Sequence, residues 1–280
     1  SSTSECGLRL LMDEQRLVAH LEAIRLVALM RAGDAARDLV EGLEARCCGT
    51  ASIGRPPPGE AELASLLEGA LRGSSVDPAA VAGGASGAAA LSPPALAAAR
   101  CSLGWAGGRP PAVVDGNSLG AFDALTFRYD ASGEGGGFGG ALCTVLCDDA
   151  AAGYSELMRF QLRVARAQGA ADAAFVELSA AERFVAARER LAARHFGDRP
   201  EARVAAVRAA RGLRERLRVA QLYRLEAAHV VKALREHTGA QLLGTCWTRL
   251  MDDLSEACTL TDVTRAHGEY LADCLLYTSP

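Results

Sequence analysis

The chain has 280 residues, of which 50% are hydrophobic and only 5% aromatic, so we expect a core built from Leu, Val and close contacts through Ala. A net charge of -4 gives no global attraction to nucleic acid or to an anionic membrane. No apolar run is long enough to cross a bilayer and no secretory signal opens the chain, so we expect an intracellular protein without membrane or nucleic-acid partners.

The nine cysteines and five histidines form no motif that indicates catalysis. The number of cysteines is odd and none has the spacing Cys-x2-Cys, which favours reduced thiols that pack as small hydrophobic side chains. The sequence contains neither His-Glu-x-x-His nor Gly-x-Ser-x-Gly. We therefore expect a protein that is not an enzyme, with no cofactor, no metal and no small-molecule substrate.

Residues 8–47 have the spacing of two helices, each with one apolar face. Gly33 and Asp34 separate them, and Asp34 is expected to cap the second helix. The two apolar faces consist of Leu17, Leu21, Ile24 and Ala28, and of Ala36, Leu39, Val40 and Leu43.

Residues 49–112 differ in character, because they contain a run of three prolines from Pro56, a second Pro pair and long Ala tracts. This composition is typical of a variable, low-complexity insertion or loop. Within it, Glu60–Leu71 has the pattern of a short helix.

Two short segments predict strands. In Leu125–Tyr129 bulky and polar side chains alternate, which places the bulky ones on one face. Ala141–Cys147 is a second apolar run. A Gly-rich stretch over residues 133–140 lies between them. We therefore predict a short β-hairpin-like segment near residues 125–147.

From Tyr154 onward the apolar spacing predicts helices only, and Gly197–Pro200 is expected to end one of them. The predicted fold class is therefore mostly α, with helical bundles and one short hairpin-like segment. The helices expected after the one that begins near Tyr154 cover about residues 172–196, 201–237, 240–256 and 262–273.

The segment Arg183–Arg218 contains 11 arginines and only four acidic residues, although the whole chain is acidic. One interpretation is a solvated helix surface in a GC-rich coding sequence, and the other is docking to an acidic partner. Nucleic acid fits less well, because aromatic residues are scarce in this segment. The candidate partner-binding residues are Arg203, Arg208, Arg211, Arg214 and Arg218.

The stretch near the C-terminal end combines three bulky residues that the biased composition of the chain does not explain. Trp247 lies on one predicted helix, and His267 and Tyr270 lie on the next. Positions i, i+3, i+4, i+7 and i+8 share one face of that second helix. These positions are Val263, Ala266, His267, Tyr270 and Leu271.

Together these stretches resemble the C-terminal domain of the gamma-tubulin complex component family. That family combines an L-x-L-x-Y strand, a Y-x-x-x-F-x-F-L-L-R-x-K-R helix, a long helix with a His, a Trp, and a final helix patterned L-D-x-[VI]-x-x-x-H-x-x-[FY]-L. The matching segments here are Leu10–Asp34, Leu125–Tyr129, Tyr154–Arg166, His229, Trp247–Leu250 and Leu260–Leu271. The family-signature residues, expected to pack in the core, are Tyr154, Phe160, Trp247, His267, Tyr270 and Leu271.

The chain departs from the family pattern at three places. Glu236 and His237 stand where the family has a Tyr-Tyr pair, and the Gly-rich stretch replaces a short W-P-L turn. Thr261 replaces the usual Asp before the last helix, where Thr is also able to cap.

The resemblance implies one domain over residues 1–273, a gamma-tubulin-binding domain that is incomplete at its C-terminal end, with 49–112 as its insertion. The last residues, 274–280, break the GC-rich style of the chain and resemble one reading frame of a transposase sequencing adapter. We expect this tail to be non-native.

The resemblance also implies a function. We expect a non-enzymatic scaffold that binds gamma-tubulin and other gamma-tubulin complex components and nucleates microtubules in the cytoplasm, at the microtubule organizing centre or spindle pole. The alternative from the residues themselves is a helical adaptor whose Arg-rich face binds an acidic protein or RNA.

Overall fold

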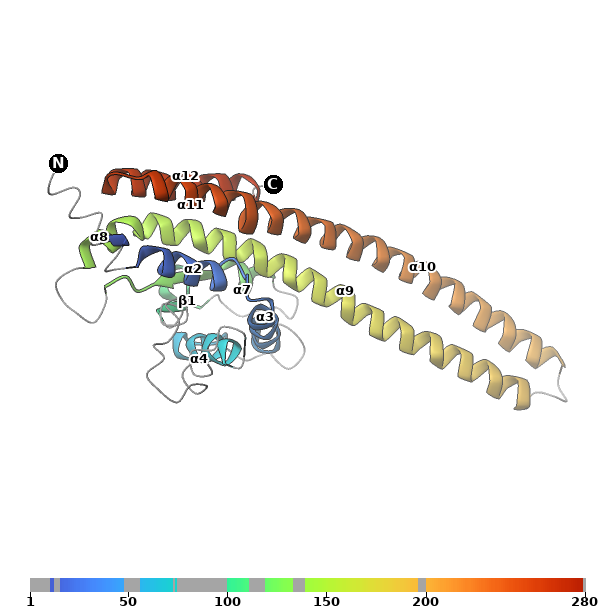
Figure 1. Ribbon diagram of the computed structural model, residues 1–280. Coiled ribbons are helices and arrows are strands. Elements are labelled where there is room, and N and C mark those ends of the chain that lie inside the picture. The colour runs from blue at the N-terminus through green and yellow to red at the C-terminus, as the bar shows by residue number, and fades with distance from the viewer. Residues whose placement is uncertain are drawn as a thin grey trace, which may run out of the picture. The chain divides into compact units, whose positions relative to one another are not determined.

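The computed structural model describes residues 11–12, 16–47, 56–72, 74, 100–110, 119–132, 139–195 and 200–278. It divides into two compact units. Unit 1 consists of Ser1–Ala165 and His237–Pro280, and unit 2 consists of Arg166–Glu236. Figure 1 shows the helices that make up most of the chain, among them the two long ones, α9 and α10, parts of which form unit 2. The predicted class, mostly α with one short hairpin-like segment, is confirmed, and the strands form a two-stranded antiparallel sheet.

The first two helices follow the predicted pattern. Helix α2 spans Leu17–Val27 and helix α3 spans Gly33–Cys47. Helix α3 begins one residue before Asp34, so Asp34 lies in the first turn instead of capping it, and its carboxylate accepts a hydrogen bond of 2.9 Å from the Ala35 amide. An acidic residue is favourable there because the helix dipole is positive at that end.

The predicted insertion, residues 49–112, contains two elements of the core. Helix α4 spans Glu60–Leu71, as predicted, and buries Leu63 and Leu67. Strand β1 spans Cys101–Trp105, where the composition had predicted a loop. Trp105 is fully buried in β1, and its indole N–H donates a 2.8 Å hydrogen bond to the Pro58 carbonyl. Residues 75–99 of this segment lie outside the described residues.

Strand β2, Leu125–Tyr129, forms as predicted, but its partner differs from the prediction. It pairs antiparallel with β1, with Leu103 opposite Phe127. The predicted second strand at Ala141–Cys147 is wrong, since Gly139–Val145 is helix α8. Leu142 and Val145 are both buried, at the i, i+3 spacing of a helix. A seven-residue run that is apolar except for Thr144 does not separate a strand from a short buried helix by periodicity alone.

Helix α9 covers the outer edge of β2. The Ser155 hydroxyl accepts a 2.9 Å hydrogen bond from the Phe127 amide and lies 3.2 Å from the Phe127 carbonyl. It also donates to the Ala151 carbonyl of its own helix at 2.7 Å. Two shorter helices, α7 at Leu119–Asp123 and the 3-10 turn η3 at Ala106–Gly108, flank the two strands.

The two longest helices are α9, Asp148–His195, and α10, Pro200–Thr238. Helix α9 is continuous, where the sequence predicted one stripe from Tyr154 and a separate helix from about residue 172. Pro200 is the first residue of α10, a position where proline loses no helical hydrogen bond. Neither helix, nor any other described helix, has the length and apolarity needed to cross a membrane.

The C-terminal part of unit 1 begins with a wide turn. Residues Gly239–Thr245 form the π-helical segment η4, followed by α11, Cys246–Glu256, and α12, Leu260–Leu276. The residue that caps α12 is Thr259, not Thr261. Its hydroxyl accepts from the Asp262 amide, and the Asp262 carboxylate accepts from the Thr259 amide, which completes a capping box.

Helix α12 buries the face that its spacing predicts, and this face continues to the end of the helix. Cys274, the first residue of the predicted non-native tail, is fully buried, and α12 runs on to Leu276. The apolar core of unit 1 joins side chains from α2, α3, α4, both strands and α12 into one cluster.

Candidate partner-binding surface

Unit 2 is a helical hairpin made by the second half of α9 and most of α10, which lie side by side (Figure 1). Among its described residues only Ala171 and Val185 are buried. The seam between the two helices is rich in Ala, with Ala206 and Ala210 on the α10 side. A pair of helices that buries so little apolar surface leaves most of its apolar side chains in solvent.

Among the residues that the structure describes, the large exposed apolar side chains are concentrated on this hairpin. They include Phe175, Phe184, Leu191, Leu222 and Tyr223, each about half exposed or more. Apolar surface on this scale in one place is typical of an interaction site.

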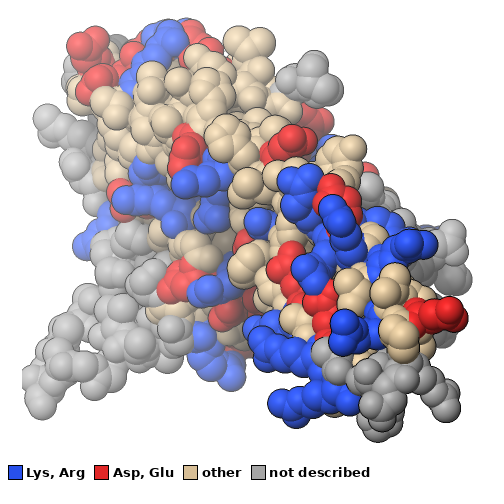
Figure 2. All heavy atoms as spheres, turned by 90° about the vertical axis from the view of Figure 1, so that its right-hand side faces the viewer, with Lys and Arg blue, Asp and Glu red and all other residues tan. Residues whose placement is uncertain are grey.

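The hairpin is also basic. Residues 166–236 contain 15 Lys and Arg against nine Asp and Glu, a net charge of +6, whereas the whole chain carries -4. In Figure 2 the hairpin faces the viewer, and Lys and Arg side chains cover much of the surface nearest the viewer. Charge separated in this way attracts an acidic partner and speeds its association.

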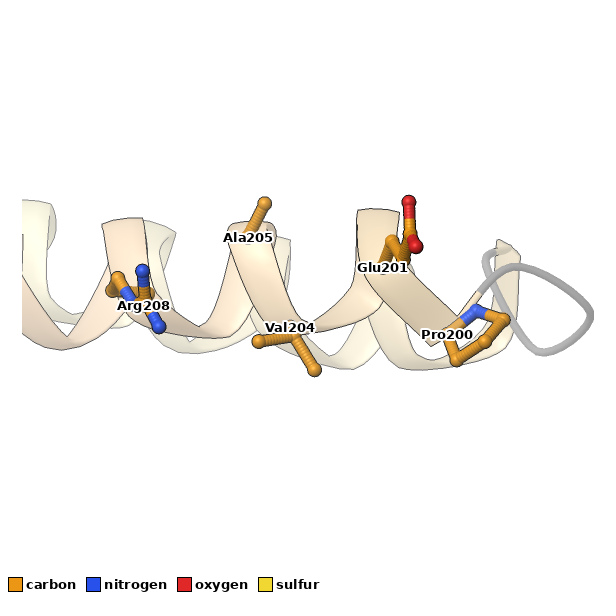
Figure 3. A pocket seen from close by; sticks show the side chains of 5 residues that line it. All are labelled: Pro200, Glu201, Val204, Ala205 and Arg208. Atoms are coloured by element: carbon orange, nitrogen blue, oxygen red, sulfur yellow. The ribbon is translucent and has the colours of Figure 1, made fainter.

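The five predicted partner-binding arginines all lie exposed on α10. Four of them fall on one face by helical spacing, whereas Arg208 is turned toward a neighbouring face. There Arg208 lines an open, shallow hollow with Pro200, Glu201, Val204 and Ala205 (Figure 3). The four that share a face are Arg203, Arg211, Arg214 and Arg218.

These arginines differ in the partners they already have. Arg214 forms an ion pair with Glu189 of α9, and Arg218 pairs with Glu215 at 2.8 Å. The Arg218 hydrogen bond holds the pKa of the Glu215 carboxyl below its usual value. Arg203, Arg208 and Arg211 have no ion pair with any described residue, which leaves three cations for an incoming partner.

The family-signature residues lie in unit 1 and are not on this surface. Tyr154, Trp247, His267, Tyr270 and Leu271 are buried, and Phe160 is only partly buried. Their burial gives them a packing role, since a buried side chain does not contact an incoming partner directly.

Two of these residues form a hydrogen-bonded pair. The Tyr154 hydroxyl lies 2.8 Å from His267 Nε2, which joins α9 to α12. Burial lowers the pKa of His267 to about 4, while a hydrogen bond with the Val145 backbone acts in the opposite direction. Burial also raises the pKa of Tyr154, so both groups are neutral at neutral pH.

Trp247 packs between Tyr270 and Arg25. The two aromatic rings meet edge to face with centroids 6.2 Å apart, and the Arg25 guanidinium lies 4.3 Å from the centre of the Trp247 ring. Arg25 is buried, and it donates a hydrogen bond to the Leu243 carbonyl within η4. A π-helical turn changes which backbone carbonyls find hydrogen-bond donors within the helix. Here the guanidinium of Arg25, from α2, is the donor to the Leu243 carbonyl.

Sequence reasoning missed Arg25 and Trp105 in the core and Phe184 and Leu191 on the hairpin. Arg25 is a charged residue in an apolar helix, and Trp105 lies in a Gly-rich segment. Neither context contains a pattern that predicts burial. The sequence did contain a pattern for Phe184 and Leu191, because they lie seven residues apart and so share one face of the helix. Val185 lies on a different face. His229, which matches the histidine of the family's long helix, is exposed on α10.

The described residues contain no group of three or more metal-ligating side chains that could hold an ion. The seven cysteines among them are free thiols, of which Cys47, Cys101, Cys246 and Cys274 are buried. Burial raises the pKa of the Cys101 thiol, as expected of an unreactive packing residue.

Fold and surface together define a mostly α-helical protein whose exposed apolar and basic side chains gather on a helical hairpin. The chain belongs to the family described as gamma tubulin complex component, C-terminal, whose model matches residues 17–277. Membership gives it the role of a component of a gamma-tubulin complex, in a family associated with the cytoskeleton and microtubule organizing centres. The comparison with individual curated proteins gave no match.

Proposed function

We propose that this chain binds gamma-tubulin directly, as a non-enzymatic scaffold in a complex that nucleates microtubules at the microtubule organizing centre or spindle pole. The observation that carries the proposal is the family match, which covers residues 17–277 and thus both units. Other components of the same complex are further partners under this proposal.

A second observation supports a scaffold that offers a broad surface. The packing signature of unit 1 is internal, whereas unit 2 presents exposed apolar and charged side chains along two long helices. Stable protein–protein contacts bury about 800 Å² on each partner, which an extended helix surface can supply without a pocket.

We place the contact with gamma-tubulin on the α10 face that carries Arg203, Arg211, Arg214 and Arg218, with Arg208 beside it. The three arginines without an ion pair to a described residue, Arg203, Arg208 and Arg211, would gain partners on an acidic surface. Charge pairs at the rim of an interface act chiefly on the association rate and its salt dependence.

The test is co-precipitation of purified gamma-tubulin with the full chain at low salt. Substituting Arg203, Arg208 and Arg211 with Glu should reduce the recovered gamma-tubulin at least about tenfold, because three attractive contacts become repulsive. A control variant reverses two exposed arginines of unit 1, Arg37 and Arg109, and should leave recovery unchanged. Absence of gamma-tubulin from the wild-type precipitate would overturn the proposal itself.

A helical adaptor for an acidic protein or for RNA is the second candidate, and the net charge of +6 on residues 166–236 favours it. Binding of RNA releases counterions, so its affinity falls steeply and linearly with the logarithm of salt concentration. A labelled single-stranded RNA titrated at several salt concentrations separates the candidates. RNA binding with several released ions, together with no recovery of gamma-tubulin, would favour the adaptor.

A further inference from the structure

The hairpin has a groove on one side that is distinct from the face carrying the candidate arginines. Its cavity measures about 680 Å³ and lies between the two helices, within residues 184–216. The α9 wall presents Phe184, Arg188 and Leu191 at i, i+4 and i+7. The α10 wall presents Ala206, Ala209, Leu213 and Arg216 at i, i+3, i+7 and i+10.

The apolar part of the groove is open to solvent. Phe184 is 66% exposed, Leu191 is 65% exposed and Leu213 is 36% exposed, although all three line the same cavity. The facing positions on α10 are alanines, which allow another backbone to come close. Two stripes at helical spacing, with a valley of small residues between them, match the shape of an amphipathic helix laid along the groove.

The charges of the groove select the chemistry of that helix. Glu189 is the one acidic residue that lines it, and Glu189 already pairs with Arg214. Arg188 and Arg216 also line it, and neither has an ion pair with a described residue. The charges that remain available to a partner are therefore positive, on a hairpin whose net charge is +6.

We propose that this groove is a docking site for an acidic amphipathic helix of a partner protein, which completes a three-helix bundle with α9 and α10. The apolar side of the helix covers Phe184, Leu191 and Leu213, and its carboxylates pair with Arg188 and Arg216. A second copy of the hairpin is a poorer occupant, because two surfaces of +6 repel each other. A bare polyanion such as RNA would leave the aliphatic lining in water.

This inference goes beyond gamma-tubulin binding and uses a different surface of the hairpin. It predicts that an acidic helix and gamma-tubulin bind independently, so that one activity survives the loss of the other.

The test uses the full chain and a fluorescent 21-residue peptide with Leu at heptad positions a and d and Glu at the flanking positions. A matched peptide carries Lys in place of Glu. Fluorescence anisotropy should show the acidic peptide binding at least tenfold more tightly than the basic one. The double variants Leu191→Glu with Leu213→Glu, and Arg188→Glu with Arg216→Glu, should each weaken the acidic peptide at least tenfold. The arginine variant should also gain affinity for the basic peptide.

Two controls keep the result interpretable. Val204→Glu changes an exposed apolar residue of α10 outside the groove and should alter peptide affinity less than twofold. Circular dichroism should show unchanged helicity in every variant, as expected for exposed positions, and the groove variants should still recover gamma-tubulin.

Three results would overturn the inference: equal binding of the two peptides, peptide binding unaffected by the groove variants, or competition of the peptide by a single-stranded RNA that binds more tightly. Self-association of the full chain that the groove variants abolish, seen by sedimentation velocity, would instead assign the groove to a second copy. Loss of gamma-tubulin recovery in the wild type, with peptide binding intact, would sink the proposed function and leave this inference standing.

Discussion

His267 shows how one buried residue ties stability to pH. It is 2% exposed, hydrogen-bonded to Tyr154 across two helices, and its folded-state pKa of about 4 lies below the ordinary value near 6.5. The unfolded chain therefore binds a proton more readily than the folded chain between these two pH values. The contribution of His267 is complete above pH 6.5 and is lost as the pH falls toward 4.

We expect the free energy of unfolding to fall by about 2–3 kcal/mol between pH 7.5 and 4.5 on account of this group. Urea denaturation at several pH values measures it. The variant His267→Gln should lose this part of the pH dependence, even though its stability at pH 7.5 is lower. The control is His229→Gln, which removes an exposed histidine that is not part of the buried Tyr154–His267 pair.

Residue types near the C-terminal end were enough to predict which side chains pack, but not how they do so. Val263, His267 and Tyr270 share a helix face by spacing alone, and that face is buried. The pairing of His267 with Tyr154 joins residues 113 positions apart, so no local pattern contains it. The burial of Arg25 could not be predicted for the same reason, because its partners lie far along the chain, in η4 and α11.

At the scale of elements, replacing a glycine with alanine should have different effects in helices and in turns. Gly169 in α9 and Gly212 in α10 have open space where a Cβ atom would lie. Glycine inside a helix costs about 1 kcal/mol relative to alanine. Gly107 also has open space, but its φ of 70° lies in the left-handed region that disfavours other residues.

We expect Gly212→Ala to stabilise the hairpin by about 0.5–1 kcal/mol, because the helix interior accepts alanine without strain. Gly107→Ala should destabilise the protein by about 1 kcal/mol, although it adds the same methyl group. Thermal unfolding followed by circular dichroism compares the two. A stabilising effect at both positions would contradict the backbone assignment of Gly107.

Elements with a long, repeated signal were predictable, whereas the strand pairing was not. Glu60–Leu71 and α10 carry several turns of apolar spacing, and their bounds agree with the sequence to within a few residues. Helix α9 was predicted as helical, but as two segments instead of one continuous helix. Strand β1 has five residues within a Gly- and Ala-rich segment, and its register depends on contact with β2. Position in the chain favoured the wrong partner, Ala141–Cys147, because it follows β2 more closely than any other apolar run.

At the scale of the whole molecule, the two units differ in how much apolar surface each one buries. Unit 1 has a continuous core that includes Trp105, Phe122 and Phe127, whereas unit 2 buries only Ala171 and Val185 among its described residues. Resistance to local opening follows buried apolar contacts. The two units should therefore open with different free energies, even though α9 and α10 run through both.

Hydrogen exchange followed by mass spectrometry should detect this difference. We expect peptides from residues 200–230 to exchange at least about 100-fold faster than peptides from residues 260–273. Binding of a partner on the hairpin should slow exchange in the first set and leave the second unchanged. Equal protection of both sets in the free protein would show that the hairpin is stable by itself.

The contact between Ser155 and Phe127 has a consequence for assembly. Strand β2 has β1 on one side, and the outward amide and carbonyl of Phe127 on the other side both meet the Ser155 hydroxyl. An edge strand with free backbone groups can recruit a strand from another molecule, which is a common route to aggregation. Here a side chain already occupies the middle of that edge. This contact blocks the addition of a further strand at the β2 edge, so strand addition there is closed as a route to assembly or aggregation.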